Sequence, residues 1–125
     1  MEKKHGLVAL LLLLLLVACD PTDNYGYPSK INFGKEGGIK FCSGRLGMSM
    51  ININDYNGNG ESEIIIDEND TIIAKYYWLT AKFKRLVGPE IKIIAEPNKT
   101  GKKRTLYVYG PIYNDYVTIK VTQDK

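Results

Sequence analysis

The chain has 125 residues, of which 44% are hydrophobic, and it carries 17 basic and 14 acidic side chains. This length and composition fit one globular domain that buries its own core. The formal charge of +3 is too small for broad electrostatic binding to nucleic acid, which requires a strongly basic surface, so no nucleic-acid partner is expected.

Residues 1–18 have the layout of an export signal. Two lysines, Lys3 and Lys4, precede an unbroken apolar run of twelve residues from Leu7 to Ala18. A retained transmembrane helix is the rival interpretation, but the roughly 30 Å hydrocarbon core needs about 20 apolar residues. A cleaved signal peptide over residues 1–18 is therefore predicted, in preference to an uncleaved anchor.

The four residues Leu16-Val17-Ala18-Cys19 resemble a bacterial lipobox. In that family the cysteine thiol receives a diacylglyceryl group, and cleavage frees an amine that is usually acylated too. The resemblance implies a lipoprotein with acylated Cys19, whose partner is membrane lipid and whose location is the cell envelope. The outer membrane is the expected site, and a periplasmic or surface orientation stays open. The alternative is a soluble secreted protein, which would lack the stable attachment that two or more acyl chains give.

The segment after Cys19 begins with a tether. Residues 19–28 are rich in turn formers and lack apolar periodicity, so the folded domain is expected at 29–125. Removing Lys3, Lys4 and Glu2 leaves 15 basic and 13 acidic side chains, a formal charge of +2. With Cys19 lipidated, Cys42 has no partner for an internal disulfide and is predicted to be a small buried residue; a reactive thiol or an intermolecular bridge is the alternative.

The residues available for chemistry argue against an enzyme. His5 is the only histidine and lies in the segment to be removed, which excludes Ser-His and Cys-His nucleophiles. Residues 55–61 begin like an EF-hand loop, but Ser62 and Ile66 stand where that loop needs an apolar residue and a bidentate Glu. A pair of carboxylates could still serve a glycosidase-type mechanism. The candidates lie in a stretch rich in Asn and Gly, where solvated turn residues are expected: Glu61, Glu63, Asp67, Glu68 and Asp70. No catalytic residue, metal or cofactor is predicted.

Apolar and polar residues alternate with a period of two over most of the domain. Strands are expected at 31–33, 39–41, 46–53 (with a bulge near Met50), 64–66, 72–73, 78–83, 90–95, 105–109 and 116–122. Many short strands separated by turn residues, with no helical pattern, predict an all-β antiparallel β-sandwich.

Five short elements in a fixed order resemble the BACON domain, an immunoglobulin-like sandwich of Bacteroidetes with a proposed carbohydrate-binding role. They are Ile31-Asn32-Phe33, Gly37-Gly38, Trp78-Leu79, Asn98-x-Thr100-Gly101-x-x-Arg104 and Val121-Thr122-Gln123. The resemblance covers residues 30–123, closely after Trp78 and loosely between Ser43 and Lys75. It implies an immunoglobulin-like fold with Trp78 as a core aromatic, which we interpret as a packing anchor rather than a ligand platform.

The outward-facing tyrosines are the best indication of a binding site. If the last two strands form a hairpin, Tyr107, Tyr109 and Tyr116 share one solvent face, with Tyr113 near the turn. Such a row can stack on sugar rings, with Lys120 giving polar contacts, or form the core of a protein interface. The alternative is purely structural, because aromatic residues suit strands and pair across them.

The expected function is therefore that of a membrane-tethered, non-enzymatic binding or spacer lipoprotein that contacts glycans through Tyr107, Tyr109 and Tyr116. The alternative is a structural or interaction lipoprotein that docks an envelope protein complex through that face or through an exposed sheet edge.

Overall fold

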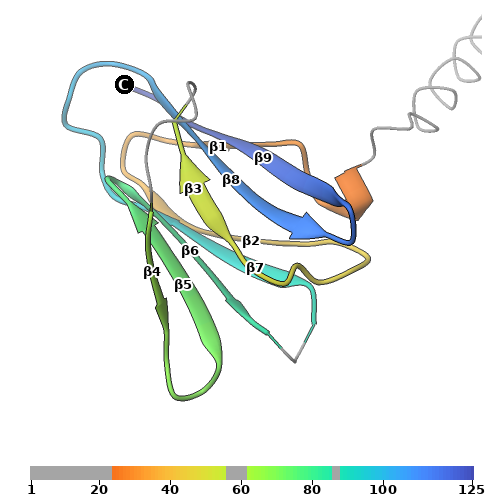
Figure 1. The fold of residues 1–125 in the computed structure, drawn as a ribbon. Helices are drawn as coiled ribbons and strands as arrows, with labels where there is room; N and C mark the ends of the chain where they lie inside the picture. Colours follow the sequence, from red (N-terminus) through yellow and green to blue (C-terminus); the bar gives the residue numbers. More distant parts are fainter. Residues whose placement is uncertain (1–23, 56–61, 86–87) are drawn as a thin grey trace, which may run out of the picture.

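The computed structural model describes residues 24–55, 62–85 and 88–125 (Figure 1). Within these ranges the chain forms one 3-10 turn at Asn24–Gly26 and nine strands. The strands are β1 (Lys30–Phe33), β2 (Gly38–Ser43), β3 (Asn52–Asn54), β4 (Glu63–Ile66), β5 (Thr71–Tyr76), β6 (Leu79–Lys84), β7 (Glu90–Ala95), β8 (Arg104–Ile112) and β9 (Asp115–Gln123). The predicted export signal, Cys19 and most of the predicted loop at 55–61 lie outside the described residues.

The strands form two sheets that pack against each other (Figure 1). One sheet has four strands in the order β1-β9-β8-β3, and the other has five in the order β2-β7-β6-β5-β4. The pairs are antiparallel except for β1 and β9, which run parallel at one edge of the four-stranded sheet. The predicted all-β antiparallel sandwich is thus confirmed.

The core lies between the two sheets and consists of the inward-facing side chains of the strands. Ile53, Ile93 and Ile119 are fully buried there, and burying such a side chain stabilises the fold by ~1.5–3 kcal/mol. Trp78 belongs to the same core, at 7% exposure, in the turn between β5 and β6. The guanidinium of Arg104 covers its ring at 4.7 Å from the centroid, so Trp78 is a packing residue.

The prediction of a strand over residues 46–50 is wrong. Residues 44–51 have no strand structure, and pairing resumes only at β3. The reason is topological: this segment leaves β2 in one sheet and crosses to β3 in the other, so it cannot stay in register with either. Its apolar residues still pack, because Met48 is buried over Gly110, where a Cβ would lie only 2.4 Å from the Met48 sulfur.

The apolar residues that alternate along β2 face solvent and not the core. Ile39 and Phe41, which continue the apolar alternation of the sequence, are 55% and 60% exposed. Cys42 points inward and is half-buried, as expected for a small packing residue. Burial, with a smaller contribution from nearby Glu90, raises the pKa of the Cys42 thiol to about 11, so the thiol is neutral at physiological pH.

Candidate functional site

The hairpin of β8 and β9 brings the three predicted tyrosines to one surface. Tyr107 stands opposite Lys120, and Pro111 stands opposite Tyr116, on the outer face of the four-stranded sheet. The rings of Tyr109 and Tyr116 meet edge to face with their centroids 6.3 Å apart. We call this outer face of β8, β9 and β3 the tyrosine face.

The tyrosines differ in how much of each is accessible. Tyr116 is 59% exposed, whereas Tyr107 and Tyr109 are half-buried between neighbouring side chains. Tyr113 lies in the turn of the hairpin and is 86% exposed. Tyr116 is therefore the ring on this sheet face that is best placed to stack on a ligand, with Tyr109 supporting it from the side.

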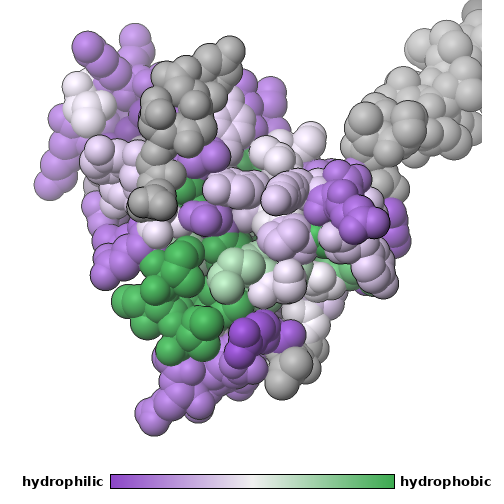
Figure 2. Space-filling model, in the orientation of Figure 1, coloured by the Kyte–Doolittle hydropathy of each residue, from purple (hydrophilic) through white to green (hydrophobic). Residues whose placement is uncertain are grey.

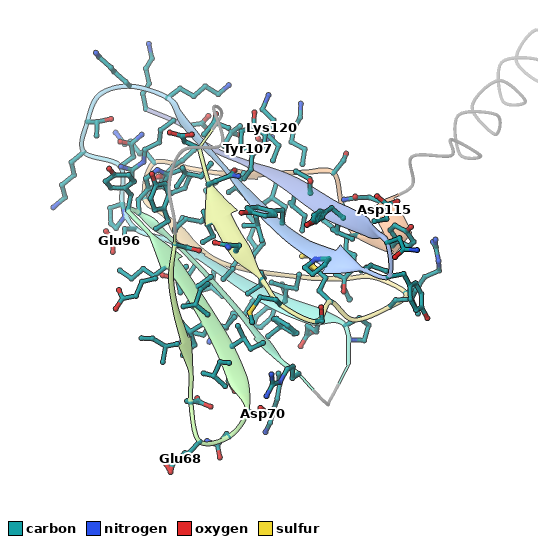
Figure 3. All side chains as sticks on the ribbon, viewed as in Figure 1. Glu68, Asp70, Glu96, Tyr107, Asp115 and Lys120 are labelled. Carbon is teal, nitrogen blue, oxygen red and sulfur yellow. The ribbon has the colours of Figure 1, made fainter. Side chains whose placement is uncertain are left out.

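Polar side chains flank the tyrosines across the strands. Asn54 of β3 stands opposite Tyr107, which in turn stands opposite Lys120, so a residue with an amide and one with an ammonium group are paired with Tyr107 on its two sides. Figure 3 labels Tyr107 and Lys120. Thr118 stands opposite Tyr109. Among the described residues, the side chains of Asn54, Thr118 and Lys120 have no hydrogen-bond or ion-pair partner, so they remain available to a ligand.

A second polar cluster, at the opposite end of the strands, is structural. Gln123 is fully buried, donates to the carbonyls of Gly34 and Glu96, and accepts a hydrogen bond of 2.8 Å from Arg104 Nε. Asn98 is also buried and donates to the carbonyls of residues 102 and 124. These residues carried much of the family resemblance, and the structure shows that they join the two sheets and hold a turn.

The carboxylates considered for catalysis or metal binding lie apart from the tyrosine face. Glu68 and Asp70 belong to the turn between β4 and β5 (Figure 3). Asp67 Oδ1 accepts the backbone N–H groups of Asn69 and Thr71, and Asp70 pairs with Arg85 at 2.5 Å. No group of three or more metal-binding side chains occurs in the described part of the chain. Glu61 lies outside it.

A patch of exposed apolar side chains lies away from the tyrosine face, at the β4 edge of the five-stranded sheet. Figure 2 shows hydrophobic side chains gathered over β4 and β5. Ile65 and Ile66 of β4 are 50% and 45% exposed, and Ile64 beside them is half-buried. Strand β3 packs over β5 and β6, and Ile65 and Ile66 at the β4 edge stay exposed.

Across residues 24–55, 62–85 and 88–125, no helix has the length and apolar character needed to span a lipid bilayer.

The comparisons with known proteins support the fold alone. No protein-family model matches the chain, and no curated protein does either. An NMR structure of a protein from Bacteroides thetaiotaomicron is similar, with a TM-score of 0.51 and 19% sequence identity. The match covers 79% of this chain and 82% of that one. At this identity the likeness shows a shared β-sandwich, and membership of the BACON family stays a prediction.

Proposed function

We propose that the protein is a membrane-tethered, non-enzymatic binding lipoprotein of the cell envelope whose tyrosine face contacts glycans. The observation that carries this proposal is the arrangement on that face: the accessible ring of Tyr116 lies on the same surface as the unengaged side chains of Asn54, Thr118 and Lys120. A sugar ring offers an apolar face for stacking and hydroxyl groups for amide, hydroxyl and ammonium partners.

The polar surroundings favour a sugar over a protein at this face. The side chains of Asn54, Thr118 and Lys120 stand beside the tyrosines, whereas the core of a protein interface is apolar and depleted of charged residues. The resemblance of residues 16–19 to a lipobox and the resemblance of residues 30–123 to a domain family with a proposed carbohydrate-binding role support the same proposal.

A glycan-array screen tests the binding half of the proposal. The chain from residue 20 onward is suitable, because every core residue of the described structure lies within it. Binding by this chain, lost in Tyr107→Ala/Tyr109→Ala and kept in Tyr77→Ala, is the expected result. Tyr77 is the matched control, since it is 74% exposed in the turn between β5 and β6, on the other sheet. Equal binding by both variants would rule out the tyrosine face.

Metabolic labelling with a fatty-acid analogue tests the tether. The full-length chain should incorporate the label and fractionate with membranes, and Cys19→Ala should do neither. Label retained by Cys19→Ala would contradict lipidation at that residue.

The edge strand β4 supports a second candidate function, docking of an envelope protein. Within the described residues, β4 pairs on one side only, with β5, and presents Ile65 and Ile66 to solvent. An exposed apolar edge can accept an added strand from another chain. Ile65→Lys should abolish capture of such a partner while leaving glycan binding unchanged.

A further inference from the structure

The outer face of the five-stranded sheet places two lysines against each other. Lys82 of β6 and Lys92 of β7 are directly opposite in the register, and both are half-buried. Like charges in this position destabilise a sheet. Lys75 on the same face pairs with Glu96 at 3.2 Å, but across the described residues no carboxylate lies within ion-pair distance of Lys82, Lys84 or Lys92. The fold therefore retains an uncompensated positive cluster.

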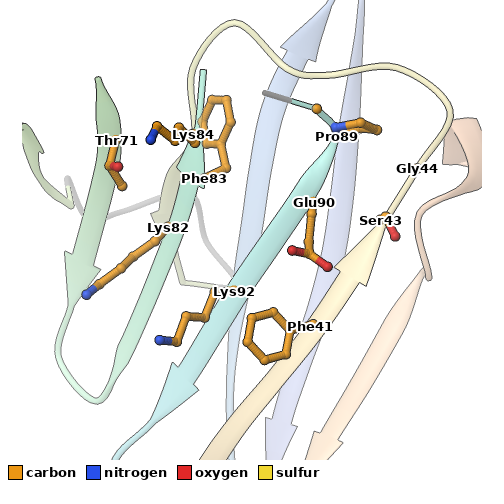
Figure 4. A pocket seen from close by; sticks show the side chains of 11 residues that line it. Phe41, Ser43, Gly44, Thr71, Lys82, Phe83, Lys84, Pro89, Glu90 and Lys92 are labelled. Carbon is orange, nitrogen blue, oxygen red and sulfur yellow. The ribbon is translucent and has the colours of Figure 1, made fainter. Parts of the chain in front are cut away.

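These lysines line an open hollow of about 690 Å³ (Figure 4). Phe41 forms part of its wall, with Lys92 Nζ 5.9 Å from the ring centroid. Glu90 is the one carboxylate among the lining residues, so the hollow has an excess of two positive charges. Phe41 is 60% exposed, which gives the hollow an apolar contact beside its ammonium groups.

The hollow lies close to Tyr25, near the N-terminal end of the described domain and on the side of Cys19 in the sequence. Gly44 lines the hollow, and the next residue, Arg45, donates its backbone N–H to the Tyr25 carbonyl at 2.8 Å. Asn24 is fixed in turn by a hydrogen bond of 2.8 Å from its side chain to the Thr118 carbonyl. Asn24 is five positions after Cys19, so the chain between them spans at most about 18 Å. A lipidated Cys19 would therefore hold this rim close to the headgroup layer.

We infer that this lysine face binds the phosphate groups of an anionic phospholipid membrane, with Phe41 entering the headgroup boundary; the inference rests on the proposed tether. Lysines near a membrane surface are attracted to anionic lipids, and an aromatic side chain beside them adds apolar contact. Ile39, on the same strand and face as Phe41, is also exposed and extends that contact. The tyrosine face is the outer surface of the other sheet, so the two proposed sites lie on opposite faces of the sandwich.

Vesicle sedimentation of the unacylated chain from residue 20 tests this inference without the anchor. We expect binding to vesicles of phosphatidylcholine and phosphatidylglycerol in equal parts, and little binding to phosphatidylcholine alone. Binding should weaken as salt is raised, because exposed charges are then screened. Lys82→Gln/Lys92→Gln should reduce it about tenfold, and Phe41→Ser should reduce it less. Failure here would leave the labelling of Cys19 unaffected, so the two proposals are separable.

The matched control is Lys102→Gln/Lys103→Gln, which removes the same charge from exposed positions in the turn before β8. It should bind the anionic vesicles as well as the parent does, and thermal unfolding should show all variants folded. An equal loss in both lysine pairs would overturn the inference, since binding would then follow net charge. Binding to a sulfated polysaccharide but not to the anionic vesicles would overturn it in favour of an acidic glycan.

Discussion

The two outer faces of the sandwich are built in the same way and carry different chemistry. On the four-stranded sheet the outward positions include tyrosine, asparagine, threonine and Lys120; on the five-stranded sheet they include several lysines, isoleucine and Phe41. The inward positions of both sheets share one apolar core. Strand alternation thus lets one domain fix its fold with half of its residues and present two separate surfaces with the other half. Glycan binding is proposed for one surface and membrane binding for the other.

Truncating a residue of the shared core should have the largest effect, because both surfaces depend on the same fold. Ile119 of β9 is fully buried between the sheets, directly beneath the tyrosine face. Ile119→Ala should lower the free energy of unfolding by about 3 kcal/mol, from lost burial and the cavity left behind. Urea denaturation measures this loss. A change below about 1 kcal/mol would contradict the shared core.

Adjacent residues of β2 should differ about a hundredfold in thiol reactivity. Cys42 points inward with a pKa of about 11, so its thiolate is scarce at pH 8; its neighbour Phe41 points outward. In the chain from residue 20, Cys42 should react slowly with a disulfide reagent, and Phe41→Cys in a Cys42→Ser background should react quickly. Equal rates would mean that the inward and outward assignment of β2 is wrong.

The pH dependence of stability has a definite sign at Cys42. Its pKa is raised in the folded state, so the unfolded chain loses the thiol proton first as pH rises. The contribution of Cys42 is therefore complete below pH 9 and falls away as pH rises toward about 11. Cys42→Ser should flatten that part of the stability profile.

A change that weakens the fold away from both surfaces should leave binding intact. Gln123→Ala removes a fully buried amide and leaves the Gly34 carbonyl without that partner, at a cost of about 2 kcal/mol. Thermal unfolding should shift downward, while glycan and vesicle binding of the folded protein stay as in the parent. Selective loss of one binding activity would show that this end of the strands belongs to a site.

The smallest effect should come from one ring. Tyr116→Ala should weaken glycan binding about fivefold, in the range of a single well-placed aromatic contact, with vesicle binding unchanged. Titration calorimetry with a glycan that the array identifies measures this directly. Unchanged affinity would remove Tyr116 from the proposed site.

Much of the fold follows from alternation that is visible in the sequence. The pattern predicts Leu106 and Val108 on one side of a strand and Tyr107 on the other, and β8 confirms it. The pattern fails where topology decides: residues 44–51 cross between sheets, so their apolar spacing does not produce a strand.

The tyrosine face could be foreseen because its residues lie on two strands that adjoin in the chain. The lysine face could not, because the pairing of Lys82 with Lys92 depends on register, and the outward orientation of Phe41 depends on which side of β2 meets the core. In the sequence, Lys82, Lys84 and Lys92 alternate with apolar residues, as charged residues do on any strand with one face in solvent.

The most direct test of the central claim is a map of backbone-amide NMR shifts as a bound glycan is titrated into the chain from residue 20. The perturbed residues should cluster on β3, β8 and β9, around Asn54, Tyr107, Tyr116 and Lys120, while the amides of β2, β6 and β7 stay unchanged. Perturbations centred on Phe41 and Lys92, or along β4, would contradict the central claim.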